Sequence, residues 1–254
     1  MPGPVQSIER AGAIIQLLAR GYGGLGIGDI ANSLDLAKGT VHGIVRTLQA
    51  IGFVEQDHSG GKYRIGPALR QLGTGYLDAN ELRSRAINWA DALAARSGEA
   101  VRIGTAQQDS VLVVHHVFRP DDTPQTLDVG ALLPLHACAL GKVLLAYDSD
   151  LTARIRAGKL ESLTRRTMIR PELLSRSLTE VRDNGWAGEY GELVPGEASI
   201  AAPIRSHGGL TVGAIGISGP AERLFPTGIH ANPTLLDYVR DAARAVSRDL
   251  VEDR

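Results

Sequence analysis

Residues 27–46, IGDIANSLDLAKGTVHGIVR, have the spacing of a helix-turn-helix. Such a motif needs a small residue where its helices cross, a residue that tolerates a left-handed turn, and apolar residues facing the core. Ala31 is the small residue, and Asp35 lies at the turn, where Asp tolerates positive φ better than most side chains. The stretch predicts short helices over about 28–34 and 39–51. Its apolar positions are Ile30, Leu34, Leu36, Val41 and Ile44.

The flanking segments extend this motif into a small domain. Between Val5 and Ala19 apolar residues recur at spacings of three and four, which predicts a preceding helix. After the motif, residues 53–56 and 62–65 flank a turn-forming run with two glycines, a pattern typical of a β-hairpin. The sequence therefore predicts an N-terminal, mainly α-helical winged helix-turn-helix. A generic small domain of three helices and a hairpin is the alternative.

The second helix of the motif has a polar outer face suited to DNA. A recognition helix presents donor-bearing side chains to base edges, and nearby cations contact phosphates. Residues 1–66 contain six Lys/Arg and five Asp/Glu, so the basic footprint is local, and we expect a dimer to double the contacts. The candidate DNA-binding residues are Lys38, Thr40 and His42 for bases, and Arg46, Lys62 and Arg64 for phosphates.

The chain is long enough for a second domain. At 254 residues it exceeds the size at which one core usually stops growing, although length alone leaves a single α/β barrel open. Beyond residue 80, helical patterns cover 81–97, 141–147, 171–184 and 233–251, and strand-length apolar runs cover 100–106, 111–118, 199–204 and 210–218. They predict an α+β domain whose helices cover a sheet. We place the DNA-binding domain at 1–66, a linker helix at 67–80 and the second domain at 81–254.

Composition restricts the class of protein. The chain is 43% hydrophobic and 22% charged with net charge −1, as in ordinary globular proteins. Its single cysteine, Cys138, excludes an internal disulfide and fits a reducing cytosol. No apolar run approaches the ~18 residues of a membrane span, and the N-terminus lacks the pattern of a secretion signal. We expect a cytoplasmic protein without a membrane partner.

Four residues offer an enzyme or zinc interpretation: His115, His116, His136 and Cys138. Adjacent histidines on a strand point to opposite faces, so they cannot share one ion without distortion. Cys138 has no Asn or Asp partner at suggestive spacing, and neither GxGxxG after a strand nor GxxxxGK[ST] occurs. The sequence predicts no catalysis, metal or cofactor. The competing interpretation is a metabolite-binding enzyme or sensor without specific DNA binding.

Longer motifs resemble a known family. VQSIERAGAIIQLLA (5–19), IGDIANSLDLAKGTVHGIVRTLQAIGFVEQD (27–57) and GKYRIGPALRQLG (61–73) resemble the DNA-binding half of the IclR family of bacterial regulators. LPLHACALGKVLLAY (133–147) and ASIAAPIRSHGGLTVGAIGISGPAERL (198–224) resemble its effector-binding half. Within the family, AKGTVHGIVRTLQ and NELRSRAINWADALAARSGE are most similar to actinobacterial glycerol-operon regulators. The resemblance implies a helix joining the winged domain to a GAF-like sensor domain, a homodimer or tetramer, and a repressor released from its DNA operator by a metabolite such as glycerol 3-phosphate or glycerol.

The resemblance also implies an effector pocket. Carried over by position, its residues are Ala137, Cys138, Ala139, Leu140, Gly141, Glu189, Ser199, Gly216 and Ser218. Several family members have Asp, Cys and Ser in place of Glu189, Ser199 and Gly216, so the ligand of this chain need not be theirs. Many members also have a larger polar residue at Gly43, which puts one DNA contact in doubt. A phosphate would use the loop amides of 139–141 or an arginine such as Arg102.

Overall fold

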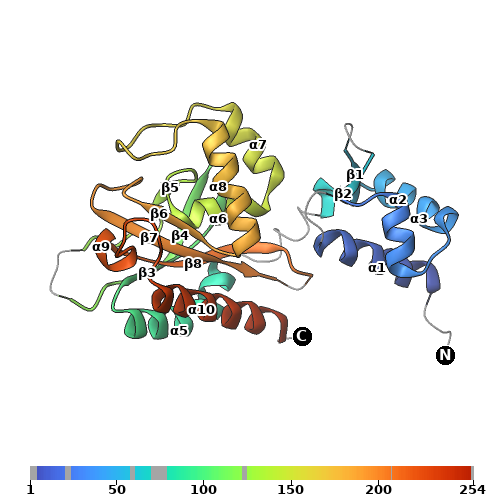
Figure 1. The fold of residues 1–254 in the computed structure, drawn as a ribbon. Coiled ribbons are helices and arrows are strands. Elements are labelled where there is room, and N and C mark those ends of the chain that lie inside the picture. The colour runs from blue at the N-terminus through green and yellow to red at the C-terminus, as the bar shows by residue number, and fades with distance from the viewer. Residues whose placement is uncertain are drawn as a thin grey trace. The chain divides into compact units, whose positions relative to one another are not determined.

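The computed structural model describes residues 5–20, 24–57, 61–69, 79–121, 125–206 and 208–252. They form two compact units, one within residues 1–78 and one that begins at Ala79 (Figure 1). None of the helices in these ranges is both long enough and apolar enough to cross a membrane.

The first unit is the winged helix-turn-helix that the sequence predicts. Its elements are α1 (Gln6–Arg20), α2 (Ile27–Leu34), α3 (Lys38–Ala50), β1 (Val54–Gln56) and β2 (Tyr63–Ile65). The two strands pair antiparallel as a hairpin, the wing, and Leu25 forms an additional bridge to Tyr63. Buried residues of all five elements form one apolar core: Ile14, Leu18, Ile30, Ala31, Val41, Val45, Leu48, Val54, Tyr63 and Ile65.

Local chemistry defines the turn between α2 and α3. At the start of α2, the Gly26 amide donates to Asp29 Oδ2 at 3.1 Å. At its end, Asp35 adopts the left-handed conformation with φ 51° and ψ 49°. The Leu36 amide then donates to the Ala31 carbonyl at 3.0 Å and closes the turn. The left-handed residue expected at the turn is therefore Asp35.

The predicted linker helix falls largely on residues that the structure does not describe. Residues 67–69 are helical, whereas 70–78 lie outside the described ranges. Ala79 and Asn80 belong to α5 (Ala79–Ser97), the first helix of the second unit.

The second unit contains one six-stranded antiparallel sheet with the strand order β5-β4-β3-β8-β7-β6. The sequence predicts the four central strands but not the edge strands β5 and β6, which have only three and four residues. The strands are β3 (Ala100–Gln107), β4 (Ser110–Val117), β5 (Leu132–Pro134), β6 (Ala187–Tyr190), β7 (Glu197–Arg205) and β8 (Thr211–Pro220).

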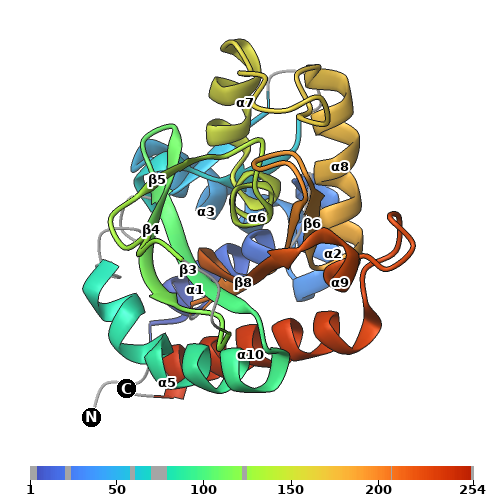
Figure 2. The ribbon, with the colours of Figure 1, turned by 90° about the vertical axis from the view of Figure 1, so that its left-hand side faces the viewer.

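Helices cover both faces of this sheet. As Figure 2 shows, α5 and α10 lie on one face, and α6, α7 and α8 lie on the other. The predicted α+β layering is thus present, with α7 and the one-turn α9 as additions. The helices after α5 are α6 (Ala139–Tyr147), α7 (Ser149–Ala157), α8 (Pro171–Asn184), α9 (Ala221–Leu224) and α10 (Pro233–Glu252).

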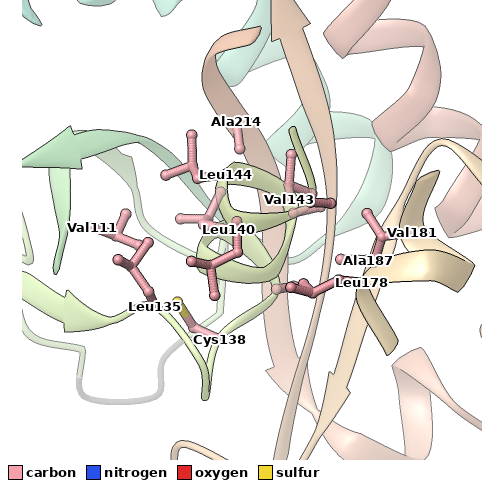
Figure 3. Close-up of a cluster of buried hydrophobic side chains, with 14 of the residues drawn as sticks. Val111, Leu135, Cys138, Leu140, Val143, Leu144, Leu178, Val181, Ala187 and Ala214 are labelled. Atoms are coloured by element: carbon pink, nitrogen blue, oxygen red, sulfur yellow. The ribbon is translucent and has the colours of Figure 1, made fainter. Parts of the chain in front are cut away.

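Helix α6 lies inside the second unit. Every residue from Ala139 to Ala146 is buried, because the helix is enclosed by the sheet and by α8. Figure 3 shows Leu140, Val143 and Leu144 packed among apolar side chains that include Leu178. An almost wholly apolar helix surface is what such a buried position requires. The start of α6 is therefore held rigidly over the sheet.

Candidate functional site

Helix α3 has one polar stripe on its exposed surface. Val41, Val45 and Leu48 face the core. Lys38, His42 and Arg46 are exposed and follow one another at intervals of four residues, so they share one flank of the helix. Thr40 lies off this stripe and is half-buried, and Gly43 is exposed with open space around it. Three of the four predicted α3 residues thus form one continuous surface.

The wing carries the other two predicted phosphate contacts. Lys62 and Arg64 are both exposed. Arg64 lies directly opposite Glu55 in the hairpin, and its Nε is 2.9 Å from Glu55 Oε1. This carboxylate neutralises part of the Arg64 charge, so Lys62 is the stronger candidate for a phosphate.

A cavity lies where the sheet meets the start of α6. Its free space is about 30 Å³, room for about two water molecules, so a metabolite requires it to open. Of the nine predicted effector residues, Ala137 and Gly141 do not line it: Ala137 is wholly buried, and Gly141 packs against Leu135. The other seven do: Cys138, Ala139, Leu140, Glu189, Ser199, Gly216 and Ser218.

Sheet register explains how distant residues meet here. Ser199 on β7 is paired with Ser218 on β8 on one side and with Glu189 on β6 on the other. Two register rows further on, Arg102 on β3 is paired with Gly216 on β8. A Cβ atom at Gly216 would lie 2.5 Å from the Ile200 carbonyl oxygen, so the close approach of β7 and β8 requires glycine there.

Glu189 is the acidic centre of the cavity. Its Oε1 accepts a hydrogen bond from Ser199 Oγ at 3.1 Å, and its Oε2 accepts one from the Glu192 amide at 2.9 Å. The Ser199 hydroxyl in turn accepts from the Ala139 amide at 3.3 Å, so this loop amide is already occupied. Burial raises the pKa of Glu189 to about 7. The carboxyl group therefore changes charge near neutral pH.

This pKa predicts a pH-dependent loss of stability. Because the folded-state pKa is raised from the ordinary glutamate value of 4.5, Glu189 favours folding below pH 4.5, and this contribution is lost as the pH rises through about 7. The expected loss is about 3 kcal/mol of unfolding free energy. The measurement is urea unfolding of wild type and Glu189→Gln between pH 4.5 and 8. The unfolding free energy of the variant relative to that of the wild type should be higher at pH 8 than at pH 4.5. A wild-type minus variant difference that is constant with pH contradicts the assignment.

Arg102 is a cavity residue whose place the sequence left open. Its Nη1 donates to Ser218 Oγ at 2.6 Å, and its Nε donates to Asp128 Oδ2 at 2.6 Å. Only the position of β3 beside β8 brings Arg102 here, and strand order is not readable from the motifs. Sequence reasoning also missed Glu197, Leu193 and Val194, which line the same cavity.

A second missed feature is a buried ion pair beside the cavity. Lys142 on α6 is fully buried, and its Nζ lies 2.5 Å from Glu192 Oε1. The same Nζ donates to the Gly188 carbonyl at 3.3 Å. The signal in the sequence was a single lysine inside the apolar run ALGKVLLAY, since a buried charge requires a partner.

The zinc and nucleophile interpretations lack the geometry they need. Burial raises the pKa of Cys138 to about 12, so its thiol stays protonated, and its Sγ caps α6 by accepting from the Gly141 amide at 3.3 Å. His136 Nε2 is 2.9 Å from the Glu161 carbonyl, and His116 Nδ1 accepts from the Asp128 amide. Within the described ranges, no three His, Cys, Asp or Glu side chains gather as metal ligands.

Comparison with known families decides the identity. Residues 7–58 match the IclR helix-turn-helix domain, and residues 74–248 match the C-terminal domain of the bacterial transcriptional regulator IclR. The chain belongs to the IclR family. It is a DNA-binding transcriptional regulator and not an enzyme. The alternative of an enzyme without specific DNA binding is set aside.

The sequences of curated relatives match this chain over nearly its whole length. The chain is 52% identical to the glycerol operon regulatory protein of Streptomyces coelicolor, covering 97% of this chain and 96% of the relative. It is 50% identical, with the same coverage, to that of Streptomyces griseus. It is 31% identical to the repressor AllR of Escherichia coli over 96% of this chain and 90% of AllR.

Solved structures show the same fold. A transcriptional regulator from Rhodococcus sp. RHA1 is 28% identical, with a TM-score of 0.62 and coverage of 97% of this chain and 98% of that one. Thermotoga maritima IclR superposes with a TM-score of 0.62 at 22% identity, covering 96% of this chain and 98% of that one, a likeness of fold alone.

Proposed function

We propose that this IclR regulator represses a glycerol-catabolic operon in the cytoplasm and leaves its operator when a small metabolite binds. The observation that carries the proposal is the 52% identity to a glycerol operon regulatory protein over 97% of the chain. The chemistry of the cavity supports it, because two serine hydroxyls, the carboxyl of Glu189 and the start of α6 suit the hydroxyl groups of a polyol. Glycerol and glycerol 3-phosphate are the two candidate effectors.

Each predicted domain has its own role in this proposal. Residues 1–66 bind operator DNA, residues 67–80 connect the two domains, and residues 81–254 bind the effector. The effector contacts Cys138, Ala139, Leu140, Glu189, Ser199, Gly216 and Ser218, while Ala137 and Gly141 shape the loop. The working form is a homodimer or tetramer whose α3 helices enter successive major grooves, one helical turn apart. Effector binding alters the separation of those helices and so lowers the affinity for the operator.

A mobility-shift assay tests this function directly. The full-length protein is incubated with DNA from upstream of its gene and of the neighbouring genes, and glycerol or glycerol 3-phosphate is titrated. We expect specific binding of the protein to this DNA, and we expect one of the two compounds to release it. Specific binding unaffected by either compound rejects the glycerol assignment, and absence of any specific binding rejects the operator assignment.

The exposed cations of the first unit should govern the salt dependence of that binding. Arg46→Ala or Lys62→Ala should weaken binding about threefold to tenfold on every DNA sequence and reduce the slope of log K against log salt by about 1 per lost contact. Arg64→Ala should have a smaller effect because Arg64 already pairs with Glu55. Arg156→Ala, an exposed arginine of α7, is the matched control. A change in sequence preference without a change in slope would show that the two cations contact bases.

A further inference from the structure

Each nitrogen of the Arg102 guanidinium contacts a polar side chain of this chain. Its Nε and Nη2 each lie 2.6 Å from the same oxygen, Asp128 Oδ2, and its Nη1 donates to Ser218 Oγ. Every nitrogen of the guanidinium therefore has an internal partner. An anionic ligand can therefore bind the Nε and Nη2 edge of the guanidinium only when Asp128 leaves it.

A second cavity adjoins this ion pair. It has a volume of about 250 Å³ and shares Arg102, Glu197 and Ser218 with the small cavity at α6. Asp128 and Arg119 line the second cavity but not the small one. The side chains of Arg102 and Asp128 are both 22% exposed, so solvent reaches the pair. The larger space thus adjoins the pair of Arg102 and Asp128, whereas the small cavity at α6 is lined by Arg102 but not by Asp128.

The backbone of Asp128 is anchored independently of its side chain. Its amide donates to His116 Nδ1 at 3.1 Å, and its carbonyl accepts from the Ala131 amide at 2.8 Å. Rotation of the carboxylate away from Arg102 therefore leaves both backbone contacts in place. Exchange of Asp128 for another anion costs a side-chain rotation and does not require the segment between β4 and β5 to unfold.

We propose that Asp128 is a built-in competitor that sets the selectivity of this regulator between anionic and uncharged effectors. The phosphate or carboxylate of an effector enters from the second cavity and replaces Asp128 on Arg102, because planar guanidinium forks bind two oxygens of such groups. An uncharged polyol cannot make this exchange, since it would leave the arginine without an anion. The inference rests on the proposed function, which makes the cavity at α6 the effector site.

Asp128→Asn tests the inference by removing the competing charge. Isothermal titration of the full-length protein with glycerol 3-phosphate, inorganic phosphate and glycerol gives the affinities. In the variant, affinity for both anions should rise about tenfold, and affinity for glycerol should stay unchanged. Adding Arg102→Gln to the variant should abolish the gain. Asp109→Asn removes the same charge from a residue 66% exposed in the β3–β4 turn, and it should change nothing.

The outcomes separate this inference from the proposed function. Equal anion affinity in wild type and Asp128→Asn, undetectable anion binding in both, or a gain that survives Arg102→Gln overturns the inference. A gain of the expected size without specific operator binding leaves the inference standing and rejects the regulatory function. Operator release by glycerol 3-phosphate that is equally sensitive in wild type and Asp128→Asn rejects the inference and leaves the function intact.

Discussion

Replacing Lys142 with methionine is expected to lower the unfolding free energy of the second unit by about 3 to 5 kcal/mol. The lysine is fully buried, and its ammonium group is the hydrogen-bond partner of Glu192 Oε1. The other oxygen, Oε2, has no partner among the described residues. Without Lys142 a buried carboxylate remains uncompensated, and its desolvation opposes folding. Urea unfolding followed by the fluorescence of Trp89 and Trp186 reports on this unit.

The double variant Lys142→Met/Glu192→Leu separates loss of the charge pair from loss of packing. Removing both charges leaves no unpaired ion, so the double variant should be more stable than Lys142→Met alone, by about 2 kcal/mol or more. If the double variant is as unstable as the single one, the lysine contributes through the packing of its alkyl chain.

Gly141→Ala is expected to destabilise the same unit by about 1 to 3 kcal/mol, although alanine is the better helix former. A Cβ atom at this position would lie 2.2 Å from the Leu135 carbonyl oxygen and 2.5 Å from the Leu135 Cα. Both are backbone atoms, so no side-chain rotation relieves the overlap, and the start of α6 must move. Tryptophan fluorescence during urea unfolding measures the loss.

Gly12→Ala in α1 is the matched control for this substitution. Nothing lies within 4 Å of a Cβ atom built at Gly12, so only helix propensity changes. The first unit should gain about 0.5 to 1 kcal/mol of stability, measured by circular dichroism. Equal effects of the two substitutions would show that the contact with Leu135 does not restrict Gly141.

The helix-turn-helix could be predicted because its signals are local. The small residue, the turn residue and the apolar spacing all lie within 20 residues, and each is decided by neighbours in sequence. Helix α8 is a similar case: Pro171 at its first position and the left-handed Gly185 after its end mark both bounds. In such segments capping and periodicity agree with the final packing.

The cavity at α6 could be predicted only in part because strand order brings it together. Seven of its sixteen lining residues followed from family motifs, but Arg102 required β3 to lie beside β8, more than 100 residues later in the chain. The short strands β5 and β6 carry too few residues for an alternating pattern. Asp128 lies outside any motif, and only its contact with Arg102 makes it noticeable.

The absence of room at Gly216 restricts how this pocket can diversify. A side chain there would meet the backbone at Ile200 and the Ala201 methyl group, 2.8 Å away, before it reached any ligand. A serine at this position would require β7 and β8 to pack differently. A substitution that places a side chain in the pocket at this position must therefore also change the packing of the sheet, so ligand preference and core packing are coupled here.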